Sequence, residues 1–253
     1  MIIDSHCHLD DFYSRHDLLS TQLTEFKSLS PSLLSMSVSS SGWLHNLQLS
    51  QLLPQVHSAL GIHPWYIESI DPGDLPLLES LLRNESVAAI GEIGLDFSTR
   101  YKHTGSDQIE LLNSQLILAL QYDKPVSLHV IKAHNEMLAS LSNYPVGGVV
   151  HGLGSSCQIA QHYIDYGLKI GVNAVLLRDN ARRYHELVRR FGLKHLVLET
   201  DFPNVYCPHK HEAELSDIIL VANKVAKLLN VSLDSVMQAT SHNANSIFQL
   251  NGL

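Results

Sequence analysis

Eight short apolar segments, separated by longer stretches of helical periodicity, constrain the fold of this 253-residue chain more than any other feature. Short runs rich in β-branched and apolar residues are typical of buried strands, and their alternation with helices is typical of βα units around a parallel sheet. The predicted strands are residues 1–5, 33–38, 56–61, 87–92, 125–129, 148–151, 168–172 and 196–200. Eight such units favour an α/β fold of the closed (β/α)8, or TIM-barrel, type over an open sheet.

Helix signals support this alternation. The segment that begins Ser106-Asp107 offers a capping residue, continues with apolar residues on one stripe, and should end before Pro125. Near the end of the chain, Ser232 is predicted to cap a final helix through Met237. Barrels of this length are commonly a single domain, so we interpret residues 1–253 as one domain.

Composition excludes several classes of protein. Hydrophobic residues make up 45% of the chain and charged residues 17%, which is typical of globular rather than disordered proteins. The formal net charge of −8 argues against a surface that binds nucleic acid everywhere, although a local positive site is compatible with it. The basic residues between positions 182 and 194 have helical spacing, and we interpret them as a solvated helix face.

Targeting signals are not evident in the sequence. The N-terminal residues lack the basic region and apolar stretch of a signal peptide, and no apolar run is long enough to span a bilayer. We therefore expect a cytoplasmic protein without membrane contacts, and the oligomeric state stays open, with a monomer as one option. Cys7, Cys157 and Cys207 lack C-x-x-C spacing and are interpreted as buried thiols.

The pair His6 and His8 follows the first predicted strand. Residues i and i+2 of a strand lie on the same face, roughly 7 Å apart, so both imidazoles could reach one metal ion while Cys7 points the other way. The pattern alone is weak evidence in a chain with 16 histidines, because His209-Lys210-His211 shows how readily it arises in a polar loop.

Four further candidate ligands lie at the ends of other apolar segments. They are Glu92, His129, His151 and Asp201. Because the carboxyl ends of all strands in a parallel barrel meet at one face, these side chains should converge with His6 and His8. A lone histidine is more often a hydrogen-bonded core or surface residue, but that explanation does not account for polar groups at five strand ends.

Imidazole and carboxylate groups are suited to zinc, manganese or other divalent ions. Glu92 is the candidate bridge between two ions, and Asp201 could bind metal and also accept the proton of a water nucleophile, so these two are the predicted catalytic residues. His63, in Gly61-Ile62-His63-Pro64, follows the third predicted strand. It is predicted to contact the substrate or a phosphate oxygen rather than a metal ion; the alternative is a turn with an incidental histidine.

The chain resembles the TatD-type metal-dependent deoxyribonucleases over nearly its whole length. The resemblance rests on His6-Cys7-His8-Leu9-Asp10, Gly61-Ile62-His63-Pro64, Gly91-Glu92-Ile93-Gly94-Leu95-Asp96 and Glu199-Thr200-Asp201 with Pro203, and on an ending similar to the family's terminal helix, Asn243-Ala244 with Ile247-Phe248. It implies a TIM barrel of the amidohydrolase-like kind and hydrolysis of phosphodiesters with a divalent metal, often 3′ to 5′ on DNA.

The same resemblance implies a role for each metal-site residue. His6, His8 and Asp201 resemble ligands of one ion, His129 and His151 resemble ligands of a second, and Glu92 resembles a ligand shared by both. It therefore implies two divalent ions per chain, with Zn, Mn and Mg as the candidates.

The substrate side departs from the family's pattern. Where the family commonly has His-Ser-Arg, the chain has His129-Val130-Ile131-Lys132, and Lys132 is a point charge where an arginine would bind phosphate bidentately. We predict that Lys132 and His63 hold the substrate phosphate. The expected partner is DNA or a small phosphorylated substrate. A phosphomonoester, amide or lactone on the same metal centre is the alternative, and a non-catalytic metal-binding protein is a more remote one.

Overall fold

The computed structural model describes residues 2–10, 16–26 and 31–250. Within these residues, eight parallel strands form one sheet in sequence order from β1 to β8. The strands are β1 Ile2–Cys7, β2 Pro31–Ser37, β3 Val56–Leu60, β4 Val87–Asp96, β5 Val126–Ile131, β6 Gly148–Val150, β7 Leu168–Val172 and β8 Leu196–Leu198. Strands β1 and β8 lie side by side, so the sheet curves into the predicted (β/α)8 TIM barrel.

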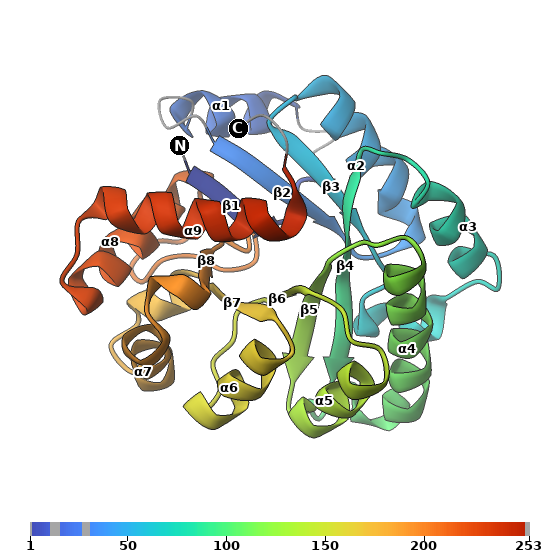
Figure 1. Cartoon of the computed structure of the whole chain (residues 1–253). Coiled ribbons are helices and arrows are strands. Elements are labelled where there is room, and N and C mark those ends of the chain that lie inside the picture. Colours follow the sequence, from blue (N-terminus) through green and yellow to red (C-terminus); the bar gives the residue numbers. More distant parts are fainter. Residues whose placement is uncertain (1, 11–15, 27–30, 251–253) are drawn as a thin grey trace.

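Helices surround this ring of strands, as Figure 1 shows. They are α1 His16–Phe26, α2 Ser40–Leu52, α3 Asp74–Leu81, α4 Gly105–Gln121, α5 His134–Asn143, α6 Cys157–Asp165, α7 Arg182–Phe191, α8 Ile218–Leu229 and α9 Leu233–Phe248. None of the helices in the described ranges combines the length and apolarity that crossing a bilayer requires.

Two apolar clusters follow from the alternation of side chains along the strands. The larger cluster lies between strands and helices and includes Ile2, Leu33 and Val150. The smaller one takes the opposite face of the strands, inside the ring, and includes Ile3 and Leu34 together with Phe248 of α9. Because α9 contacts both β1 and β8, its apolar side chains help to fill the barrel at the end where the strands begin.

The barrel closes at its other end through backbone hydrogen bonds beyond β1 and β8. The amide of Asp201 donates to the carbonyl oxygen of His6 at 2.9 Å, and the amide of His8 donates to the carbonyl oxygen of Phe202 at 2.7 Å. These bonds bring the segment after β8 against the end of β1, which places Asp201 beside the two histidines.

Strand β4 is longer than predicted and ends at Asp96 instead of Glu92. The strand continues because Ile93 and Leu95 are fully buried, although Gly91 and Gly94 interrupt the apolar pattern in the sequence. Gly94 has a φ of 153°, and a Cβ there would collide with the carbonyl oxygen of His129. Glycine is thus required where β4 passes close to β5.

Two helix boundaries also differ from expectation. Helix α4 begins at Gly105, and no side chain caps it, so the predicted capping role of the Ser106-Asp107 pair is wrong; Asp107 lies in the first turn. Ser232 does cap α9, because its hydroxyl accepts from the amide of Ser235 at 3.1 Å. That helix, however, continues past Met237 to Phe248.

The exposure of the basic residues and of the cysteines bears on two of the predictions. Four arginines of α7 and the following lysine are exposed, as expected for a solvated helix face; they are Arg182, Arg183, Arg189, Arg190 and Lys194. Cys7 and Cys207 are buried, whereas Cys157 is partly exposed. All three thiols are free.

Candidate metal centre

The predicted ligands come together at the end of the barrel where the strands terminate. His6 lies on β1, Glu92 on β4 and His129 on β5, while His151 directly follows β6 and Asp201 lies three residues beyond the end of β8. The side chains of these residues are at most 11% exposed. His8 completes the set immediately after β1, so all six predicted ligands belong to one buried cluster.

Glu92 lies at the middle of this cluster, and its two carboxylate oxygens face different histidines. Oε2 is 3.4 Å from Nε2 of His6 and 3.5 Å from Nε2 of His8. Oε1 is 3.0 Å from Nδ1 of His129 and 3.2 Å from Nε2 of His151. The Glu92 carboxylate thus lies between two histidine pairs.

Asp201 lies beside the first histidine pair. Its Oδ1 is 3.3 Å from Nε2 of His8 and 3.9 Å from Nε2 of His6. Asn204 donates to the same oxygen from Nδ2 at 3.2 Å and so fixes the orientation of the carboxylate. Asp201 has a φ of 55°, a left-handed conformation that allows the chain to turn sharply after β8.

His63 lies inside the cluster, next to Glu92. Its Nε2 is 3.5 Å from Oε1 of Glu92, and its ring is buried against that of His129, with centroids 4.4 Å apart. Its Nδ1 accepts from the amide of Trp65, which closes the first turn of the 3-10 helix η3, Pro64–Ser69. His63 is therefore placed where it could contact either a metal ion or a substrate.

Lys132 is not brought into the cluster. It is exposed immediately after β5, with a φ of 56°. None of the contacts described for the cluster involves Lys132. Its predicted role in binding a substrate phosphate stays a prediction.

Two carboxylates behind the histidines were not among the predicted site residues. Glu199 Oε1 is 3.3 Å from Nδ1 of His151 and accepts from the amide of Gly152 at 2.6 Å. Asp96 Oδ2 is 3.5 Å from Nε2 of His129. Carboxylates of this kind commonly orient metal-binding histidines by holding the second ring nitrogen.

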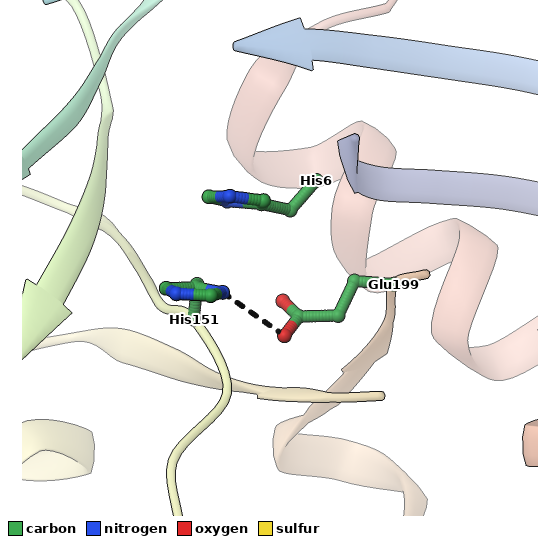
Figure 2. Close-up of side chains that lie close together, drawn as sticks. All are labelled: His6, His151 and Glu199. Atoms are coloured by element: carbon green, nitrogen blue, oxygen red, sulfur yellow. Dashed lines mark ion pairs between the residues drawn. The ribbon is translucent and has the colours of Figure 1, made fainter. Parts of the chain in front are cut away.

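Figure 2 shows how Glu199 reaches His151 while the rings of His6 and His151 stack. The two ring centroids are 4.0 Å apart and the planes differ by 13°. The Glu199 side chain lies over Gly171 of β7, where a Cβ would collide with its Oε2. This carboxylate therefore needs a glycine on the neighbouring strand.

The charges of the centre influence one another strongly. Burial opposes ionisation of Glu92, but His63 and His151 hold its pKa well below the usual range. Burial opposes protonation of His151, but Glu92 and Glu199 raise its pKa well above the usual value. Asp201, next to His8, has its pKa lowered to about 2 despite burial. The ionised carboxylates of Glu92 and Asp201 thus make this buried site favourable for a positively charged group.

The donor set fits a divalent metal. Three groups each have donor atoms within 4.8 Å of one another, and two of them share Glu92: His6, His8 and Glu92; His63, Glu92 and His129; and His6, His151 and Glu199. The ring nitrogens that face Glu92 converge on its carboxylate from His6, His8, His129 and His151. Imidazole nitrogens and carboxylate oxygens suit zinc or manganese, and Cys7 is excluded because its thiol faces the carbonyl of Leu34.

Comparisons with known proteins agree with this geometry. The model of the family described as TatD related DNase matches residues 3–249. The uncharacterized metal-dependent hydrolase YjjV of Escherichia coli is 32% identical over 213 residues, which cover 80% of each chain. The human protein named deoxyribonuclease TATDN3 is 26% identical over 98% of this chain and 94% of its own. The crystal structure of the TatD homolog YJJV from E. coli superposes with a TM-score of 0.91 at 28% identity and covers 98% of both chains.

Proposed function

The chain belongs to the TatD-related DNase family of metal-dependent hydrolases, and on that premise we propose that it hydrolyses phosphodiester bonds of DNA, releasing nucleotides from the 3′ end of single strands. The observation that carries the proposal is the division of the Glu92 carboxylate between two histidine pairs. A pair of ions held in this way is a recurrent solution for in-line displacement at phosphorus.

The proposed ligand sets follow the contacts around Glu92. His6, His8 and Asp201 would hold one divalent ion, and His129 and His151 would hold the other, with Glu92 shared. His63 lies close enough to the shared carboxylate to join the second set or to contact the substrate. When bound, zinc, manganese or magnesium supplies Lewis acidity and makes water nucleophilic at neutral pH.

The residues of the chain would then perform the remaining steps. Asp201 takes the proton of the attacking water, a role that fits a carboxylate beside the first histidine pair and oriented by Asn204. Glu199 keeps the Nε2 of His151 directed at Glu92. Lys132, outside the centre, supplies positive charge to the substrate phosphate as it approaches.

A second candidate is hydrolysis of a small phosphomonoester on the same centre. The formal net charge of −8 favours it, because an acidic chain attracts a long polyanion less than a small substrate. Lys132, exposed and apart from the centre, also gives a weaker phosphate site than an arginine fork would.

One assay distinguishes these candidates. The metal-replete protein is incubated with a 5′-labelled single-stranded oligonucleotide and, separately, with panels of phosphomonoesters and lactones; the chelated protein is the matched control. We expect a ladder that shortens from the 3′ end and requires metal. The His6→Ala/His8→Ala double variant, purified identically, controls for contaminating nucleases. An intact oligonucleotide in the presence of fully metal-loaded protein would refute the nuclease proposal, and turnover of a phosphomonoester alone would establish the second candidate.

A further inference from the structure

An exposed tryptophan lies against the metal centre. The side chain of Trp65 is 51% exposed, although residues of this type are usually mostly buried. Its polar edge is fixed, because the indole N–H donates to Oδ2 of Asp96 at 2.6 Å. The ring also lies edge-to-face near His63 and His129, with centroid distances of 4.7 Å and 5.8 Å. The indole therefore extends from the centre out to solvent.

A second aromatic ring and a cation extend this surface. The ring of Tyr101, in the connection between β4 and α4, stacks on Trp65 with centroids 5.4 Å apart and planes 15° from parallel. The guanidinium carbon of Arg100 lies 5.2 Å from the centroid of Tyr101. Arg100 and Lys102 are both exposed, so the same connection presents two positive charges beside the stacked rings.

We infer that Trp65 and Tyr101 form the surface on which the base of the terminal nucleotide stacks while its phosphodiester lies at the metal centre. This inference rests on the proposed phosphodiesterase function and names the part of the substrate that binds beside it. A nucleobase is the planar group that such a surface fits, since every base has a π-face that can stack on an aromatic side chain regardless of sequence. Arg100 and Lys102 would contact neighbouring phosphates on an otherwise acidic protein.

Trp65 also has a structural role that is independent of stacking, because it orients Asp96. Its N–H holds Asp96, and Asp96 lies 3.5 Å from Nε2 of His129. Loss of the indole would therefore disturb His129 even if no base ever contacted the ring. Substitution of Tyr101 distinguishes the two roles. Removing its ring takes away the stacking partner and leaves the hydrogen bond from Trp65 to Asp96 in place.

The test compares two oligonucleotides that differ only in the 3′-terminal residue, which is a normal nucleotide in one and abasic in the other. For the wild type, we expect kcat/KM to be roughly 5- to 150-fold higher on the normal end, the range that corresponds to stacking of one base. Tyr101→Leu and Trp65→Leu should remove most of this preference. Trp65→Phe should keep the preference and lower kcat on both substrates alike, since it retains a ring and loses the N–H.

Tyr166→Leu serves as the matched control. Tyr166 is a partly exposed tyrosine at the C-cap of α6, two residues before β7 and at the end of the barrel opposite the centre, and its replacement should leave both rates unchanged. Metal content and circular dichroism of every variant are measured on the same samples. Equal wild-type rates on the two oligonucleotides would overturn the stacking role. So would Tyr101→Leu and Trp65→Leu variants that slow both substrates by the same factor and keep the preference.

A binding measurement keeps this inference separate from the nuclease proposal. Titration with thymidine 5′-monophosphate should quench the fluorescence of Trp65, whereas deoxyribose 5-phosphate should not. Trp65→Phe retains only the buried Trp43 and gives the background signal. Quenching by the nucleotide in a protein that cleaves no oligonucleotide would support base binding while refuting the nuclease. Cleavage of both oligonucleotides without quenching or base preference would support the nuclease proposal and refute base stacking.

Discussion

Replacing Glu92 by glutamine is expected to weaken both metal sites together. The side chain is 5% exposed and keeps its size in the variant, but one negative charge is lost between the two histidine pairs. Removing a carboxylate that merely supports a ligand typically costs 10- to 100-fold in metal affinity. Because Glu92 offers one oxygen to each pair, we expect a loss of at least about 100-fold, or ~2.7 kcal/mol, for each ion.

The assay is equilibrium dialysis of metal-free wild type and variant against graded, chelator-buffered free zinc or manganese, with bound metal determined by mass spectrometry. The wild type should bind two equivalents, and in the variant both binding steps should move to higher free metal. Glu110→Gln, which removes the same charge from an exposed position on α4, is the matched control and should bind like the wild type. A variant in which a single equivalent weakens while the other is retained would show that Glu92 serves one ion only.

Three further substitutions test the remaining roles. Asp201→Asn should lower kcat on an oligonucleotide by about 10²- to 10⁴-fold at constant KM, because a proton acceptor acts in the transition state; a change confined to KM, at matched metal content, would exclude that role. Glu199→Gln should lower the affinity for one ion by about 10- to 100-fold through loss of the carboxylate behind His151, and equal weakening of both ions in metal titrations contradicts this. Lys132→Ala should raise KM for DNA by a factor that shrinks with added salt, since exposed charges are screened within about 8 Å at physiological ionic strength; a salt-independent effect would count against a phosphate contact.

Much of the fold could be predicted because buried parallel strands are apolar on both faces and stand out from the amphipathic helices between them. The strand ends were less predictable. Strand β8 stops at Leu198, two residues early, because Thr200 bonds instead to a side chain, its amide donating to Oδ1 of Asp4 at 3.0 Å. Periodicity alone ends α9 too early because the second half of the helix is polar, and only the family resemblance assigns Asn243 to the terminal helix. Asn243 is buried there by donating to the carbonyls of Leu193 and Leu196.

The six predicted ligands were accessible from the sequence because each lies at or near the end of an apolar segment, and parallel strands in a barrel bring such positions together. Asp96 and Glu199 could have been found by extending the same reasoning, since each lies at the end of a strand or immediately after it. Trp65 could not have been found from the sequence, because its proposed role in stacking depends on contacts with Asp96 and Tyr101, which belong to other segments. Sequence spacing carries no information about such contacts.

Asp96 is shared between the indole of Trp65 and the imidazole of His129, and this sharing links two events that are otherwise separate. Both groups contact the same oxygen, Oδ2, so a reorientation of the histidine would reach the indole through a single atom. Thermodynamic coupling is reciprocal, so an ion that binds His129 more tightly when the base is stacked must strengthen stacking by the same factor. The identity of the metal would then set the preference among nucleotides as well as the rate, and substitutions at Asp96 would uncouple the two.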